Sequence, residues 1–230
     1  MSEDPHGLRP HGQTRTRAVR TSPEERRDQI IEAAASLLRE RSFSDITVGT
    51  LQAHLGLSKG GLYHHIKSKN DILFLVCEQA GRNMLAALAD AERVEGRARD
   101  RLDQLVSGHL AAMSRYGGAL WAFFSERDNL PAEKRDHIVR LEREYLHGVV
   151  RLFQQAQESG EVYDDVSPRL LADALLGMIN WFVRWRPSEL DGEQLSKAFS
   201  RILADATFVE DRASASAPGR RLPANRPDET

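Results

Sequence analysis

Cysteine and long apolar runs are the scarcest features of this chain of 230 residues. The single thiol, Cys77, cannot form an intrachain disulfide, which fits a reducing cytoplasm. No apolar run approaches the roughly 18 residues of a membrane-spanning helix, and the basic N-terminus lacks the apolar core of a signal peptide. These absences predict a soluble, cytoplasmic protein with no membrane partner.

A large excess of either charge is also absent, because the formal net charge is only −2. This value excludes a generally basic nucleic-acid binder, so any affinity for DNA must come from a local patch. Residues 1–21 form a candidate patch, since four arginines and no acid fall between Pro5 and Thr21. We expect a disordered basic arm there, which either follows DNA phosphates or is a solvated tail.

Stretches that alternate apolar and polar residues are missing too, which argues against a sheet and predicts an all-α fold. A capping box at Ser22 starts the first helix. Helical spacing recurs over 102–116, 120–127, 132–158, 168–185 and 192–209, with a break at Gly117-Gly118. We therefore expect a DNA-binding domain at 22–68, a ligand-binding and dimerisation domain at 69–209 that begins with a linking helix at 69–91, and a disordered tail at 210–230.

Two short amphipathic helices joined by a glycine turn follow the first helix, and their pattern predicts a helix-turn-helix. Thr47 is the predicted N-cap of one helix, Gly56 lies in the turn, and Ser58 is the predicted N-cap of the next. The second helix, from Ser58 to about Ile66, is the predicted recognition helix.

One face of the recognition helix carries the side chains best suited to contact DNA. Lys59 and His64 suit a base edge or a phosphate, and Tyr63 suits a phosphate or a thymine methyl. Lys67 and Lys69, near the next helix start, suit phosphates. The Gly60-Gly61 pair costs about 1 kcal/mol per glycine in a helix. It either lets the backbone approach a phosphate or is simply a weak helix that tightens on docking.

This stretch resembles the DNA-binding region of the TetR family of bacterial transcription repressors, with Ile66 at a usual Phe and Gly61 at a usual Thr, Ser or Ala. The resemblance rests on Gly56, Leu57, Ser58, Lys59, Gly60, Leu62, Tyr63, His65 and Lys69. It implies a homodimeric repressor on a palindromic operator in double-stranded DNA, with Lys59, Tyr63, His65 and Lys69 at the DNA backbone. The full predicted DNA-contact set is Thr47, Ser58, Lys59, Gly60, Gly61, Tyr63, His64, His65, Lys67 and Lys69.

Catalysis and metal binding find little support in the same residues. The segment 56–60 matches G-x-S-x-G of serine hydrolases, but that motif needs a preceding strand, and residues 48–55 have helical period. His54, His64 and His65 lie on different helix faces with no adjacent cysteine. We expect no catalytic residue, no metal and no cofactor other than a small-molecule effector.

The last two predicted helices carry apolar stripes that suit a dimer. We expect the interface to contain Leu171, Ala174, Leu175, Leu195, Phe199 and Ile202 in a four-helix bundle. The alternative is that these stripes close the core of the monomer itself.

Aromatic and sulfur side chains gather in the second domain, where bundles place apolar ligand sites. Segments 175–187 and 123–131 resemble the TetR-type regulators that respond to acyl-CoA thioesters, although the Tyr that this subset often has between Trp185 and Arg186 is absent here. The predicted pocket residues are Met113, Trp121, Phe124, Arg127, Tyr145, Met178, Trp181, Phe182 and Arg184. A rival interpretation is a drug-efflux repressor that binds lipophilic cations through Glu126, Glu144 or Asp173.

Overall fold

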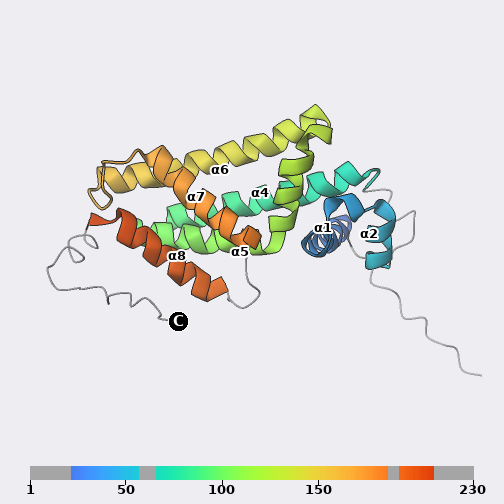
Figure 1. Cartoon of the computed structure of the whole chain (residues 1–230), viewed down its shortest axis with the longest axis horizontal. Helices are drawn as coiled ribbons and strands as arrows, with labels where there is room; N and C mark the ends of the chain where they lie inside the picture. Colours follow the sequence, from blue (N-terminus) through green and yellow to red (C-terminus); the bar gives the residue numbers. More distant parts are fainter. Residues whose placement is uncertain (1–21, 57–65, 186–191, 210–230) are drawn as a thin grey trace, which may run out of the picture.

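The computed structural model describes residues 22–56, 66–185 and 192–209, apart from the side chains of 124–125 and 182–185. Its regular elements there are helices, with no strand, which confirms the all-α prediction. They are α1 (Pro23–Glu40), η1 (Phe43–Asp45), α2 (Val48–Leu55), α4 (Lys69–Arg93), α5 (Ala98–Glu126), η2 (Arg127–Asn129), α6 (Ala132–Glu158), α7 (Pro168–Trp185) and α8 (Gly192–Thr207) (Figure 1).

Side-chain caps confirm the helix starts predicted at Ser22 and Thr47. The Ser22 hydroxyl accepts from the Glu25 amide at 3.1 Å, and the Glu25 carboxylate accepts from the Ser22 amide at 2.7 Å. Thr47 accepts from the Thr50 amide at 3.0 Å in the same way. Gly56 ends α2 with a φ of 62°, a left-handed conformation that glycine adopts without a steric penalty. Local chemistry therefore fixes where α1 and α2 begin and where α2 ends.

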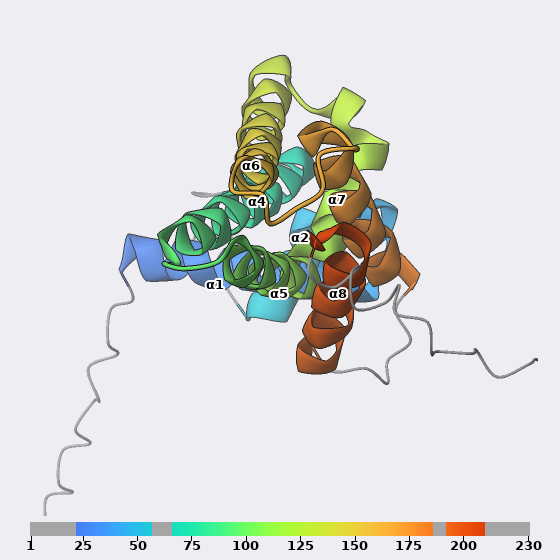
Figure 2. The ribbon, with the colours of Figure 1, turned by 90° about the vertical axis from the view of Figure 1, so that its left-hand side faces the viewer.

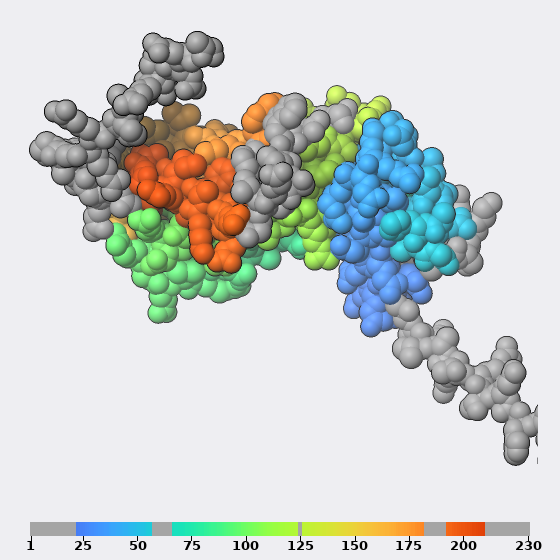
Figure 3. Space-filling model, turned by 60° about the horizontal axis from the view of Figure 1, so that its bottom comes forward, coloured from blue at the N-terminus to red at the C-terminus, as the bar shows by residue number. Residues whose placement is uncertain are grey.

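The head, which we define as residues 22–56 and 66–68, lies at one end of the long axis, and α8 lies toward the other end (Figures 1 and 3). Viewed end-on, α4 lies between α5 and α6 (Figure 2), and it packs against both. Ile30 and Leu51 of the head share one buried cluster with Val76 of α4, Phe123 of α5 and Ile138 of α6. The head is therefore packed onto the body, which we define as residues 69–185 and 192–209, rather than joined to it by a bare linker.

The structure contradicts the predicted break at Gly117-Gly118, because α5 is one continuous helix from Ala98 to Glu126. Its ribbon changes direction in its second half (Figure 1). A β-carbon on Gly118 would stand 2.2 Å from the backbone oxygen of Leu38 in α1. The missing side chain therefore serves close packing of two helix backbones, a use that sequence spacing does not distinguish from a helix break.

Helix α4 is long and apolar enough to cross a membrane by length and composition alone. It is the one helix in the described segments that meets those criteria, and buried helices of soluble folds meet them too. Glu78 at its middle is buried and paired with Arg27 of α1. A helix that packs against α5 and α6 and carries such a charge pair is best explained as the core helix of the body.

The far end of the body is closed by contacts between the α6–α7 connection and the end of α8. The Tyr163 amide donates to the Thr207 oxygen, and the Val209 amide donates to the Glu161 oxygen, both at 3.1 Å. The Glu161 carboxylate also accepts from the Ala98 amide at 3.0 and 3.1 Å, which caps the start of α5. A residue 63 positions later in the chain thus supplies a cap that Arg97, the local N-cap residue, does not.

Candidate functional site

The helix-turn-helix is described for its first helix only. Residues 57–65 lie outside the described segments, so the predicted contacts Ser58, Lys59, Gly60, Gly61, Tyr63, His64 and His65 remain predictions. Thr47 is exposed, but its hydroxyl already accepts from the Thr50 amide. Its role in the structure is to cap α2, and its contact with DNA stays a prediction.

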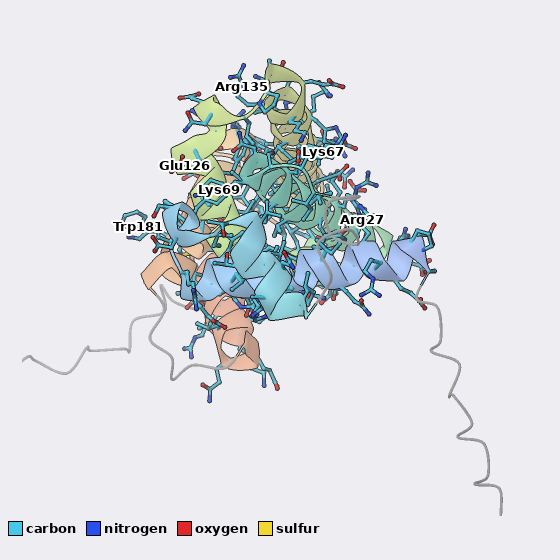
Figure 4. All side chains as sticks on the ribbon, turned by 90° about the vertical axis from the view of Figure 1, so that its right-hand side faces the viewer. Arg27, Lys67, Lys69, Glu126, Arg135 and Trp181 are labelled. Atoms are coloured by element: carbon cyan, nitrogen blue, oxygen red, sulfur yellow. The ribbon has the colours of Figure 1, made fainter. Side chains whose placement is uncertain are left out.

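The two lysines after the recognition segment differ in their surroundings. Lys67 is exposed (Figure 4). Lys69 donates to the Ser44 backbone oxygen at 3.0 Å, and its ammonium lies 4.3 Å from the centre of the Phe43 ring. Lys69 therefore ties the start of α4 to η1, and Lys67 is the lysine that carries charge without such a tie.

Asp71 organises the joint between the recognition segment and α4. Its carboxylate accepts from the amides of Lys67 at 2.9 Å and Ser68 at 2.8 Å, and it pairs with Lys134 of α6. Burial alone would raise the pKa of Asp71, but the hydrogen bonds from Lys134, Lys67 and Ser68 outweigh it and lower the pKa. The carboxylate is therefore charged at neutral pH, and it links the N-terminus of α4 to α6.

A cavity of about 240 Å³ lies between α4, α5, α6 and α7, and the middle of α4 forms one of its walls. Its described lining is mainly apolar and comprises Cys77, Gly81, Met84, His109, Met113, Leu120, Trp121, Ile138, Leu141, Glu142, Tyr145, Leu146, Leu176 and Asn180. Such a cavity in a helix bundle is a typical site for a small apolar ligand.

Three of the nine predicted pocket residues line this cavity, namely Met113, Trp121 and Tyr145. Arg127 is exposed, and Met178 packs against the core of the body. Trp181 lies at the surface, 60% exposed (Figure 4), with its ring 6.3 Å from that of Trp121 in an edge-on arrangement. The side chains of Phe124, Phe182 and Arg184 lie outside what the structure describes.

The polar end of the cavity is a hydrogen-bonded trio that the sequence analysis missed. His109 is buried, with Nδ1 2.8 Å from the Tyr145 hydroxyl and Nε2 2.8 Å from Asn180 Oδ1. Burial lowers the pKa of His109 to about 4, although the bond to Asn180 opposes the shift. The ring is therefore neutral at pH 7. Because Asn180 Oδ1 can only accept, Nε2 carries the proton and Nδ1 accepts from Tyr145.

Glu142 is the acid in the described cavity wall, and the sequence analysis missed it as well. Burial raises its pKa, and the charge of Arg127 opposes that effect. The three acids expected for a cation site lie elsewhere. Glu144 is exposed, Asp173 is exposed and paired with Arg169 at 2.8 Å, and Glu126 accepts from Asn129 at 3.0 Å.

The predicted dimer residues divide into two groups. Leu175, Leu195 and Phe199 are at most 5% exposed and pack within the monomer's own core, so these three do not form an external surface. Leu171 is half-buried against the same core, whereas Ala174 is exposed. Ile202 is 51% exposed, and so is Leu170 at 59%. Both stripes therefore have an inner side that the monomer uses and an outer side that it does not.

Comparison with known families identifies both halves of the chain. Residues 30–76 match the model of "Bacterial regulatory proteins, tetR family", a region that includes α2 and the segment after it. Residues 95–207 match the model "Tetracyclin repressor-like, C-terminal domain". The chain belongs to the TetR family. It is a DNA-binding transcription regulator and not an enzyme, and α2 stands where a serine hydrolase would need a strand.

The relatives of this TetR-family protein are themselves named as transcription or metabolism regulators. It is 28% identical over 186 residues, 78% of this chain and 89% of the other, to the HTH-type transcriptional regulator BetI of Stenotrophomonas maltophilia. It is 21% identical over 152 residues to the fatty acid metabolism regulator protein of Bacillus subtilis, covering 66% and 78% of the two chains.

A solved structure shows the same fold. It is that of AibR in complex with isovaleryl coenzyme A and operator DNA, which matches with a TM-score of 0.65 and 24% identity. The match covers 77% of this chain and 97% of AibR.

Proposed function

We propose that this protein is a homodimeric transcriptional repressor, located in the cytoplasm, that binds a palindromic operator and is released by an acyl-CoA thioester. The observation that carries the proposal is the mainly apolar cavity against α4, the helix that leads directly from the recognition segment. A ligand there acts on the helix that carries the head.

The size and chemistry of the cavity support an acyl chain. A volume of about 240 Å³ accepts a short acyl group but not a whole acyl-CoA, so the nucleotide would lie outside. Arg127 is exposed and close enough to lower the pKa of Glu142, which suits a phosphate contact at the rim. The AibR complex and the fatty acid metabolism regulator lend support by likeness.

The dimer is supported by unpaired apolar surface on α7 and α8. Leu170 of α7 and Ile202 of α8 are each more than half exposed, and Ala174 is exposed about one turn after Leu170 on α7. Two-fold dimers suit a helix-turn-helix because the two heads then read half-sites about 34–36 Å apart, or multiples of that distance. DNA is released if effector binding favours a distance between the two heads of the dimer that no longer fits successive major grooves.

Glu142 favours a second candidate effector, a lipophilic cation. Its carboxylate accepts no hydrogen bond from the described residues and stands in a wall that also contains Trp121 and Tyr145. A carboxylate beside aromatic faces is a favourable site for a quaternary or aromatic cation. Under this alternative the protein is still a TetR-type repressor, but of drug efflux.

The DNA claim is tested first. Duplexes that bind the full-length protein would be selected from random sequences, and the stoichiometry would be measured by analytical ultracentrifugation. We expect an even number of chains on a palindromic duplex, with affinity that falls steeply as salt rises. A monomer that binds no duplex at low salt would contradict the proposal.

The effector claim is tested on the resulting complex with isovaleryl-CoA, octanoyl-CoA, the matching free acids and cationic dyes. Release by thioesters supports the first candidate, and release by dyes alone supports the second. Glu142→Gln, with the exposed Glu144→Gln as matched control, separates them further. We expect Glu142→Gln to leave the thioester response intact, whereas a cation response would be lost in that variant and kept in Glu144→Gln.

A further inference from the structure

Glu78 is a buried carboxylate that contacts charged or ionisable groups from three helices. Its Oε2 atom lies 2.8 Å from Arg27 Nη2 of α1, where α1 passes α4 (Figure 4). Its Oε1 atom lies 3.0 Å from Arg82 Nη2 on α4 itself and 3.2 Å from His137 Nε2 of α6. The Glu78 side chain is only 11% exposed. One carboxylate therefore joins α1 of the head to α4 and α6 of the body.

The three contacts differ in kind. Those from Arg27 and Arg82 are hydrogen bonds. His137 is close, but its Nε2 atom is not aligned for a hydrogen bond with Glu78 and forms no other hydrogen bond among the described residues. The α6 contact is thus the weakest of the three, and a small shift of α6 is enough to change it.

The carboxylate is also adjacent to the cavity. Cys77 and Gly81, which flank Glu78 on α4, line the cavity wall, and so does Ile138, the residue after His137 on α6. A molecule that spreads α4 and α6 at the cavity therefore also separates Glu78 from His137. Because packed helices shift as rigid units, this movement reaches Arg27 and the head.

The exposed fractions of the paired side chains distinguish Glu78 from another ion pair between head and body. Arg115 of α5 also pairs with Glu32 of α1, but these side chains are 54% and 47% exposed, and exposed pairs contribute little. Loss of Arg27 is more costly, because it takes one of two hydrogen-bonded arginines from a carboxylate that is only 11% exposed. Loss of the Arg27 contact should therefore change the population of head orientations, and loss of the Arg115 contact much less.

We propose that Glu78 is a positioning residue for DNA binding, a latch that holds the head in its DNA-competent orientation while Arg27 and His137 both contact it. The effector opens the latch by moving α6 away from α4. The release by the effector rests on the function proposed for the cavity. The holding of the head by Glu78 does not.

The test uses two variants that cut the latch and one matched control. Arg27→Gln removes the α1 contact, and His137→Gln removes the α6 contact. Arg82→Gln removes an arginine from the same carboxylate without cutting any contact between helices, because Arg82 and Glu78 lie on the same helix. A merely electrostatic or structural role of Glu78 would make Arg27→Gln and Arg82→Gln behave alike.

Head orientation would be measured in the full chain by the distance between spin labels at Ala53→Cys in the head and Glu144→Cys on α6, both exposed sites. The native Cys77 is buried, and burial raises the pKa of its thiol, so it should label poorly. Affinity for the selected duplex and thermal stability would be measured on the same variants.

We expect a broader distance distribution and about tenfold weaker duplex binding for Arg27→Gln, a smaller change of the same kind for His137→Gln, and neither for Arg82→Gln. Partial recovery in Arg27→Lys would support the latch further. Equal behaviour of Arg27→Gln and Arg82→Gln, or an unchanged distribution in both latch variants, would overturn it. The distance measurement needs neither DNA nor effector, so failure of the latch is separate from failure of the repressor proposal.

Discussion

Gly118 of α5 lies against the backbone carbonyl of Leu38 in α1, so closely that a β-carbon on Gly118 would stand 2.2 Å from that oxygen. The neighbouring backbone atoms, the Leu38 carbonyl carbon and the Arg39 nitrogen, would be 2.7 and 3.2 Å away. Arg39 also donates to the Arg115 oxygen at 2.9 Å. Head and body thus meet backbone to backbone, one turn before Trp121 of the cavity wall.

We expect Gly118→Ala to destabilise the protein by about 1–3 kcal/mol, because backbone atoms cannot move aside as a flexible side chain can. The measurement is the free energy of unfolding in denaturant. Gly177→Ala is the matched control, since that glycine lies in α7 with open space around its would-be β-carbon. Alanine there should be neutral or stabilising by up to about 1 kcal/mol. A stabilised Gly118→Ala variant would contradict the close approach.

A second prediction concerns stability against pH through His109. Its pKa is about 4 in the folded protein, below its ordinary value of 6.5, so the unfolded chain binds more protons between these values. Stability should therefore rise with pH from 4 to 6.5, by about 3 kcal/mol for a shift of this size. His109→Gln should remove this dependence, whereas the exposed His147→Gln should keep it. The same slope in both variants would show that His109 is not its source.

The cap on α5 gives a third prediction. Glu161 accepts twice from the Ala98 amide, so Glu161→Ala should lower the free energy of unfolding by about 0.5–2 kcal/mol, as for other N-cap losses. The exposed Glu158→Ala, at the end of α6, has no such contact and serves as control. Chemical denaturation of both variants decides the point, and equal stability would exclude the cap.

A fourth prediction separates the two lysines near the recognition segment. Lys67→Ala should weaken duplex binding and reduce the slope of log affinity against log salt by about 0.9, with no change in melting temperature. Lys69→Ala should also lower the melting temperature, because Lys69 holds Ser44 and lies over Phe43. An unchanged salt slope in Lys67→Ala would remove that residue from the DNA surface.

Local chemistry made the capped helix starts predictable from the sequence. Ser22, Thr47 and Ser68 cap their helices through partners three residues away, and Gly56 is placed by its own backbone freedom. Such features need no knowledge of the rest of the fold. The fold class followed from periodicity for the same reason.

The cavity was predictable only in part because its polar residues are distant in the chain. His109, Tyr145 and Asn180 come from three helices, and a hydrogen bond between them leaves no trace in spacing. Glu142 lies on a helix with many charged residues, so the sequence does not distinguish it from exposed acids. Only its burial in the folded protein does so.

The dimer surface shows a related limit. Periodicity identifies an apolar stripe but not its partner, so the sequence leaves both a dimer interface and the monomer's own core open for Leu175, Leu195 and Phe199, and the structure buries them in the core.

The most direct test of the central claim is one titration of isovaleryl-CoA into the complex of protein and fluorescent duplex, followed by anisotropy. It compares wild type with Leu176→Trp, whose larger side chain would fill the cavity from α7. We expect thioester to release the duplex from wild type, and we expect the filled variant to bind the duplex but no longer release it. Equal release from both proteins would contradict control of DNA binding through this cavity.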